Sequence, residues 1–196
     1  MRIGLAGYMG AGKSTCAHTL HSLDTVIIGA DTEAKLLMQS DSKLQLDLKK
    51  AFGESVIDGD TIRFSELGCK AFLSVDTLLT LNKIIHPPLV KHLEPLVRND
   101  EKQHCILDAA LIPLWHIESW FHICIWVDSP FEVRLERLKA KRADVEEKEL
   151  RRRMRLQEEV MPVPQSTRWV KLPDSECGQY IQNQLEMKTP DTKGQG

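Results

Sequence analysis

The segment 7–15, with the sequence GYMGAGKST, carries the residue types and the spacing that hold a polyphosphate. It follows an apolar run, precedes a helical pattern, and matches G-x-x-x-x-G-K-[S/T]. Glycines let backbone N–H groups face phosphate oxygens, the helix N-terminus adds partial positive charge, and the lysine reaches the outer phosphates. The alternative is a glycine-rich turn without a ligand. The segment predicts a nucleotide-binding loop formed by Gly7, Met9, Gly10, Ala11, Gly12, Lys13, Ser14 and Thr15.

Two carboxylates follow apolar runs that predict strands. Asp31 ends the run TVIIGAD at 25–31, and Asp108 lies in the run HCILDAA at 104–110. Ligands of open α/β sheets bind at the carboxyl ends of parallel strands. We expect Asp31 to accept the proton of an attacking hydroxyl, with a helix N-cap as the alternative. We expect Asp108 and Ser14 to hold Mg²⁺, with a cap or a loop hydrogen bond as the alternative for Asp108.

A basic segment at 134–155 contains ten Lys or Arg and five Asp or Glu residues, a local charge of +5. A positively charged lid suits a triphosphate, and arginine binds phosphate oxygens in a bidentate fork. We select Arg142, at the predicted break before ADVEE, and Arg153, on the returning helix. For most of the other charges we expect a solvated helix face with i,i+4 ion pairs.

The elements that must position these residues form a predicted α/β fold. Five apolar, β-rich runs begin near residues 2, 25, 104, 122 and 168, and helical stretches separate them. Nearly continuous apolar runs indicate strands buried on both faces, so we expect a five-stranded parallel sheet flanked by helices. Residues 33–101 are expected to form a helical insertion, broken by the turn IDGD at 57–60 and by Pro87-Pro88. Residues 186–196 are expected to form a flexible tail.

Composition excludes several classes of protein. The chain of 196 residues has 42% hydrophobic and 28% charged residues and a net charge of -2, so no global attraction to nucleic acid or to an anionic membrane is expected. Five scattered cysteines without a CxxC pair indicate neither a disulfide framework nor a zinc site, and a reducing cytoplasm fits them. A guanine-reading Asn-Lys-x-Asp element is missing, because Ile84 and Ile85 follow Asn82-Lys83.

In its motifs and their order the chain resembles the dephospho-coenzyme A kinases. The likeness runs from Ile3 to about Pro162 through GLAGYMGAGKST, VIIGAD, AFGESVIDGD, LNKIIHP, ILDAAL and RRRMRLQ. It implies a P-loop kinase that uses ATP and Mg²⁺ to phosphorylate the 3'-hydroxyl of dephospho-coenzyme A, the last step of coenzyme A synthesis. It also implies a nucleotide core at 1–32 and 102–185 with a lid at about 137–158, and a substrate-binding insertion at 33–101.

The resemblance also suggests roles for individual residues. Lys13 and Asp31 match the loop lysine and the catalytic carboxylate, and Arg142 and Arg153 approximate the lid arginines. His86 matches the histidine of a His-Pro that closes an insertion helix, where we expect it to shape the substrate cleft. Besides Asp31, His86 and Asp108, we include Trp115 among the candidate substrate contacts, because it has an aromatic face for an adenine or a pantetheine arm. For Trp115, Trp120 and Phe121 the alternative is core packing.

The chain departs from the family pattern around the acceptor. Gly29 stands where an acidic residue usually precedes the catalytic aspartate, and Phe64 stands in the place of an arginine. The segment DAALIPLWHIESW replaces the usual Asp-x-Pro-Leu-Leu, and KLPDSECG lacks the Asn-x-Gly that helps frame the adenine. Two alternatives stay open: a kinase for another small hydroxylated or nucleoside monophosphate acceptor, and a non-catalytic ATP sensor. The oligomeric state is left open between a monomer and a weak homo-oligomer.

Overall fold

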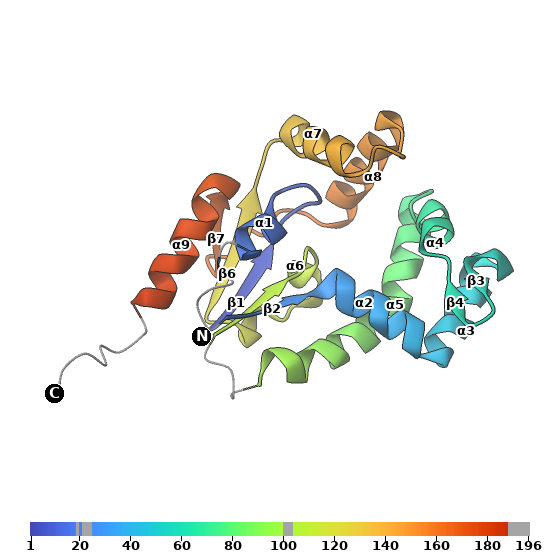
Figure 1. Cartoon of the computed structure of the whole chain (residues 1–196), viewed down its shortest axis with the longest axis horizontal. Helices are drawn as coiled ribbons and strands as arrows, with labels where there is room; N and C mark the ends of the chain where they lie inside the picture. The colour runs from blue at the N-terminus through green and yellow to red at the C-terminus, as the bar shows by residue number, and fades with distance from the viewer. Residues whose placement is uncertain (19, 21–24, 100–103, 188–196) are drawn as a thin grey trace.

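A parallel five-stranded sheet forms the centre of the molecule (Figure 1). The computed structural model describes residues 1–18, 20, 25–99 and 104–187. All five strand predictions are confirmed, and every neighbouring pair in the order β2-β5-β1-β6-β7 is parallel. The strands are β1 Arg2–Ala6, β2 Thr25–Gly29, β5 His104–Asp108, β6 Ile123–Asp128 and β7 Trp169–Pro173.

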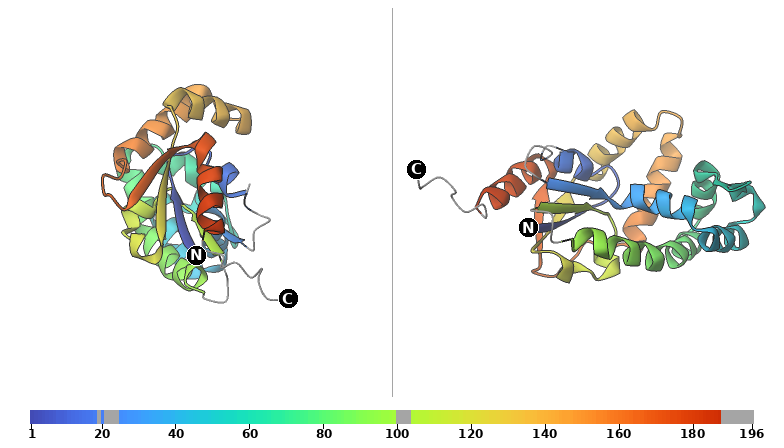
Figure 2. Two further views of the ribbon diagram at one scale, coloured as in Figure 1. Left: turned by 90° about the vertical axis from the view of Figure 1, so that its left-hand side faces the viewer. Right: turned by 60° about the horizontal axis from the view of Figure 1, so that its bottom comes forward.

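The two faces of the sheet bury two different apolar clusters, because successive strand side chains point to opposite faces. One cluster takes Leu5 and Ile125 and packs under helices α1 (Lys13–His18) and α9 (Asp174–Glu186). The other takes the neighbouring residues Ala6 and Trp126 and continues into the helices between β2 and β5. Figure 2 shows α9 on one side of the strands and the helices of the long insertion on the other. The sheet is therefore covered on both faces.

The insertion between β2 and β5 is mainly helical and extends away from the sheet (Figure 1). The predicted turn at 57–60 is confirmed as a two-stranded hairpin in which Gly59 has φ 59°. Its elements are α2 Ala30–Ser40, α3 Ser42–Phe52, the 3₁₀ helix η1 Glu54–Val56, β3 Ile57–Asp58, β4 Thr61–Ile62, α4 Phe64–Ala71 and α5 Val75–Val97.

The prediction of a break at Pro87-Pro88 is wrong, because α5 continues through both residues. Each proline removes a backbone N–H from the helix, which normally disfavours a helix interior. Tertiary packing outweighs that cost here: Ile85, Leu89, Leu93 and Val97 recur every four residues and all lie in the buried cluster. The helix starts with a reciprocal capping box between Ser74 and Thr77.

The segments that follow β5 and β6 complete the fold. Two short helices follow β5: α6 Ile112–Trp115 and the 3₁₀ helix η2 Glu118–Trp120. Trp120 and Phe121 are buried in the core, which agrees with the alternative of core packing for these two residues. After β6, α7 Phe131–Lys141 and α8 Glu147–Val160 form a helical hairpin. Residues 188–196 of the predicted tail lie outside the described residues. Within the described part of the chain, no helix has the length and apolarity needed to cross a membrane.

Candidate active site

The loop between β1 and α1 packs tightly against neighbouring backbone. Gly7 and Gly10 have φ values of 146° and 77°, a region that residues with a side chain rarely adopt. A Cβ on Gly7 would lie 2.5 Å from the carbonyl oxygen of Val127, and one on Gly10 would lie 2.7 Å from the carbonyl oxygen of Arg134. Both glycines are therefore required by conformation and by space.

Lys13 lies half-buried beneath this loop. Its Nζ donates to the carbonyl of Tyr8 at 3.2 Å, and the same carbonyl accepts the N–H of Ala11 at 3.1 Å. Burial lowers the pKa of Lys13 below its ordinary value, while the carboxylates of Asp108 and Asp31 act in the opposite direction. The ammonium is thus held close to two negative groups at the carboxyl end of the sheet.

Ser14 and Asp108 bring two oxygen ligands together. Ser14 Oγ donates to Asp108 Oδ2 at 2.6 Å, and Asp108 ends β5 as predicted. Mg²⁺ prefers oxygen ligands and usually takes only one or two from the protein, with phosphates and waters completing its shell. Within the described residues no group of three or more His, Cys, Asp or Glu side chains is arranged to hold a metal. The pair fits a magnesium ion that is shared with a polyphosphate, rather than an ion enclosed by the protein.

Asp31 lies in the first turn of α2, so two expectations about it are wrong. Strand β2 ends at Gly29, and Gly29 is also the N-cap of α2, which leaves Asp31 as neither a strand end nor a cap. The reason is that the helix begins directly after the strand, at Ala30. The side chain still lines the same cavity as Lys13, with an acidic group at the positive end of the helix.

A cavity of about 460 Å³ joins the loop, the insertion and the helical hairpin. It is lined by the predicted residues Met9, Lys13, Ser14, Asp31, His86, Asp108, Trp115, Arg142 and Arg153, together with apolar side chains of α5. A second cavity of about 290 Å³ lies on the other side of Lys13 and Ser14, lined by Gly10, Gly12 and Thr15 with Arg137, Leu138, Lys141 and Asp174. Gly7 and Ala11 line neither cavity; Ala11 is buried in the core.

His86 lies in the middle of α5, so the expectation of a helix-end histidine is wrong, because α5 continues past Pro87. Its ring meets the ring of Trp115 edge-on, with centroids 5.6 Å apart and an interplanar angle of 78°. Burial lowers the pKa of His86 from 6.5 to about 4, so the imidazole is neutral near pH 7. The buried Nε1 of Trp115 has no hydrogen-bond partner among the described residues. The pair forms an aromatic wall with an unused donor.

The two predicted arginines of the α7–α8 hairpin differ in whether their guanidinium groups are paired within the described residues. Arg142 is the C-cap of α7, and in the described part of the chain its guanidinium has neither an ion pair nor a hydrogen bond. Arg153 donates from Nε to Glu149 at 2.6 Å and lies over the ring of Phe72. Both arginines line the 460 Å³ cavity. The guanidinium of Arg142 is available to an anion, whereas that of Arg153 is already bound to Glu149.

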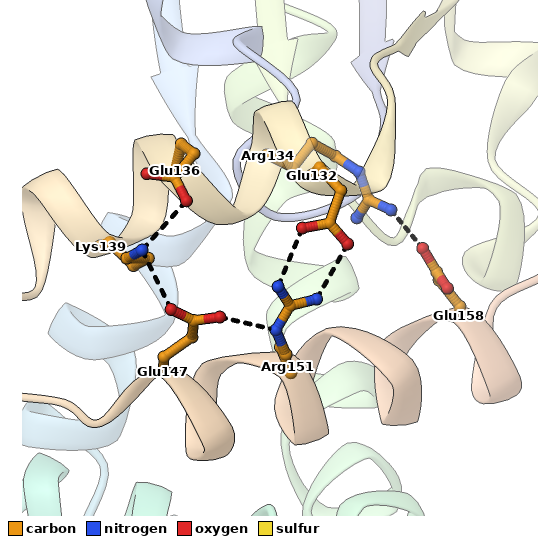
Figure 3. Close-up of polar contacts among 7 residues, drawn as sticks. All are labelled: Glu132, Arg134, Glu136, Lys139, Glu147, Arg151 and Glu158. Atoms are coloured by element: carbon orange, nitrogen blue, oxygen red, sulfur yellow. Dashed lines mark hydrogen bonds and ion pairs between the residues drawn. The ribbon is translucent and has the colours of Figure 1, made fainter.

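Most other charges of the hairpin pair with one another, as the ion-pair alternative predicts (Figure 3). Arg151 binds Glu132 through two hydrogen bonds of 2.9 Å and also binds Glu147, which pairs in turn with Lys139. The side chain of Arg134 is 3% exposed and pairs with Glu158. The excess positive charge of the hairpin is therefore presented to a ligand by only a few side chains.

Sequence reasoning missed two contacts between the hairpin and the phosphate loop. Gln157 Oε1 accepts the backbone N–H of Met9 at 2.7 Å. Arg137 donates to Asp174 at 2.7 Å, and its other terminal nitrogen lies 3.4 Å from the carbonyl oxygen of Gly10. Gln157 belongs to the quoted segment RRRMRLQ, but nothing in that pattern indicates which loop residue it meets.

A parallel sheet whose first strand leads into a phosphate loop, with a cationic helical hairpin over that loop, defines a P-loop kinase. The family model described as dephospho-CoA kinase matches residues 1–168. The chain belongs to the dephospho-CoA kinase family.

Individual relatives carry the same name. A dephospho-CoA kinase from Corynebacterium efficiens is 32% identical over 158 residues, which cover 79% of this chain and 78% of that protein. One from Deinococcus radiodurans is 32% identical over 143 residues, or 71% of this chain and 68% of that protein.

The crystal structure of TT1252 from Thermus thermophilus has a TM-score of 0.69 at 23% identity, over 97% of this chain and 98% of that chain. Dephospho-CoA kinase from Campylobacter jejuni has a TM-score of 0.57 at 18% identity, over 96% and 98%. The two structures share the fold.

Proposed function

We propose that this kinase transfers the γ-phosphoryl group of ATP to the 3'-hydroxyl of dephospho-CoA, with the transfer taking place in the 460 Å³ cavity. The observation that carries the proposal is that one cavity holds the loop lysine Lys13, the carboxylate of Asp31 and the unpaired guanidinium of Arg142. Membership of the dephospho-CoA kinase family supports the choice of donor and acceptor.

The roles of these groups follow from the charges that move. The acceptor oxygen forms a bond to the γ-phosphorus, the bond from that phosphorus to the β,γ-bridging oxygen breaks, and ADP leaves. Asp31 orients the hydroxyl and takes its proton. Lys13, Arg142 and Arg153 offset negative charge on the transferring group, so the residues act by positioning and electrostatics rather than by covalent catalysis.

Mg²⁺ fits the oxygen atoms of Ser14 and Asp108, which are 2.6 Å apart. When bound with the nucleotide, the ion would neutralise phosphate charge. We propose these two residues as its protein ligands.

The acceptor would lie against the insertion. His86 and Trp115 supply an aromatic wall, and Leu81, Ile85 and Leu89 supply an apolar surface, which together suit an adenine ring or a pantetheine arm. The proposed organisation has a nucleotide core at 1–32 and 102–185, a lid at about 137–158 and the substrate-binding insertion at 33–101. We also propose a cytoplasmic location.

The test is ATP-dependent conversion of dephospho-CoA to coenzyme A by the purified protein, with Mg²⁺ present and with EDTA as the control. We expect conversion with Mg²⁺ and none with EDTA. Phosphorylation of another hydroxylated compound or nucleoside monophosphate, with dephospho-CoA left unchanged, would reject the acceptor. Tight ATP binding without turnover on any acceptor would reject an enzyme and favour a sensor.

A further inference from the structure

The C-terminal end of α8 is attached to the phosphate loop by side chains that the proposed mechanism does not yet use. Gln157 Oε1 accepts the Met9 N–H at 2.7 Å. Beside it, the hydroxyl of Tyr8 donates to the carbonyl of Met161 at 2.9 Å. The ion pair of Arg134 and Glu158 joins the same end of α8 to α7. The position of Gln157 relative to the loop is therefore held from several directions.

The contact with Met9 also determines which way the amide of Gln157 faces. A backbone N–H can only donate, so the atom of Gln157 that meets it must be the oxygen. The amide nitrogen Nε2 is then the other terminal atom, with two N–H donors. Among the described residues Nε2 has no hydrogen-bond partner, and Gln157 lines the cavity that contains Lys13 and Asp31.

We propose that Gln157 is a further catalytic residue: Oε1 anchors its amide to the loop, and Nε2 donates a hydrogen bond to an oxygen of the transferring phosphoryl group. A donor that is already held in place costs no reorganisation during the reaction, which is the condition for strong electrostatic stabilisation. The neutral amide adds this donor without adding charge beside Lys13. This proposal rests on the proposed kinase function of the same cavity.

Two substitutions separate the anchor from the donor. Gln157→Glu keeps an oxygen for the Met9 N–H but places a second oxygen where Nε2 stood. Gln157→Met removes both the acceptor and the donor at similar length. If Nε2 contacts the phosphoryl group, both variants should lower kcat by about 10²-fold, with Gln157→Glu at least as impaired, and KM for ATP should change much less.

The matched control is Glu159→Gln, which changes a charge at an exposed position of the same helix. It should leave kcat within about twofold of the wild-type value, because most surface substitutions have small effects. Thermal unfolding of all variants checks that the fold is intact.

The readouts are coenzyme A formation and ADP release in the absence of acceptor, since the donor should act on the phosphoryl group whether an alcohol or water attacks it. A wild-type kcat for Gln157→Glu beside a reduced kcat for Gln157→Met would overturn the donor role and leave only an anchor. Wild-type kcat for both variants would overturn the proposal completely. If the wild-type protein itself releases ADP without converting dephospho-CoA, the acceptor assignment fails, while the comparison of ADP release still tests Gln157.

Discussion

At the scale of single residues, two carboxylates lie near the ammonium of Lys13, whose charged form would otherwise be disfavoured by burial. Lys13 is half-buried, and the carboxylates of Asp108 and Asp31 counteract the effect of burial on its pKa. A buried charge is tolerated when it is paired, and it interacts more strongly than in water. The same ammonium can therefore exchange its contact with the Tyr8 carbonyl for contacts with phosphate oxygens.

Substitution of the loop lysine should abolish this electrostatic contribution. Lys13→Met keeps most of the aliphatic stem and removes the charge, so we expect kcat/KM for ATP to fall by at least about 10³-fold. Steady-state kinetics with ATP and dephospho-CoA measure the effect, and circular dichroism checks the fold. Activity within tenfold of the wild-type value would contradict the role assigned to Lys13.

Substitution of the proposed base should separate binding from chemistry. Asp31→Asn keeps the shape of the side chain but cannot take the acceptor proton, so ATP binding should persist while kcat falls by about 10²–10⁴-fold. Calorimetric titration with ATP and steady-state kinetics provide the two measurements. A wild-type kcat would show that Asp31 is not the base.

His86 should make stability depend on pH. Its pKa is lowered by burial from 6.5 to about 4, so the unfolded chain binds the proton more readily between these values. Stability should be fully present above pH 6.5 and should decrease as the pH falls, by about 3 kcal/mol at pH 4. Urea unfolding at pH 7.5 and pH 4.5 measures this, and His86→Phe should remove that part of the pH dependence. Equal pH dependence in both proteins would contradict the assignment.

Local motifs predicted the parts of the site that are local in sequence. The loop at 7–15 and the strand-ending Asp108 depend on a strand followed by a few residues, and both lie where they were expected. The contact of Gln157 with Met9 joins segments far apart in the chain, so no spacing could indicate it. The position of Asp31 in a helix depended on where β2 ends, and strand ends are poorly determined by composition alone.

At the scale of elements, the α7–α8 hairpin is held together by two kinds of ion pair. The ion pairs that Lys139 and Arg151 form with glutamates lie toward solvent, where such pairs contribute little to the free energy of unfolding. Arg134, in contrast, is buried, and its guanidinium lies against the rings of Tyr8 and Phe131. Its ion-pair partner is Glu158 (Figure 3). The buried pair should therefore determine how firmly the hairpin is attached to the loop.

Removing the buried arginine should be costly. Arg134→Met leaves Glu158 without its partner and removes the cation from the face of Tyr8, so we expect a loss of about 2–3 kcal/mol in the free energy of unfolding. Urea unfolding measures it. Lys139→Met is the matched control on the exposed side of α7, and its midpoint should stay at the wild-type value. Equal effects of the two substitutions would contradict the distinction between buried and exposed pairs.

Helix α5 shows where element prediction fails. Two adjacent prolines indicate a helix end, because proline has no backbone N–H to donate to the helix. This local rule is usually sound. Here the apolar residues at 85, 89, 93 and 97 continue the same buried stripe across Pro87 and Pro88. The apolar pattern was visible in the sequence. Whether the buried area outweighs the hydrogen bonds lost at the prolines depends on tertiary packing, which the sequence pattern does not reveal.

At the scale of the whole molecule, the insertion shares its core with one face of the sheet. Leu93 of α5 and Leu107 of β5 belong to the same buried cluster. The insertion therefore should not unfold separately, although it extends from the sheet in the ribbon (Figure 2).

Leu93→Ala should test this shared core. Leu93 is 0% exposed, so its truncation should cost about 2–5 kcal/mol. Because the core is continuous, tryptophan fluorescence and far-ultraviolet circular dichroism should report one coincident unfolding transition, shifted to lower urea in the variant. Two separate transitions, with only one shifted, would show that the insertion folds independently.

The strand order has a consequence for how the chain is made. β1 lies between β5 and β6, with Arg2 beside Cys105 and Ile3 beside Ile123, so both neighbours of this apolar strand leave the ribosome long after it does. Until then its backbone groups have no sheet partners, and the nascent protein must keep the strand from pairing with other chains. The nucleotide pocket, built directly on β1, can be completed only after β5 and β6 have been made.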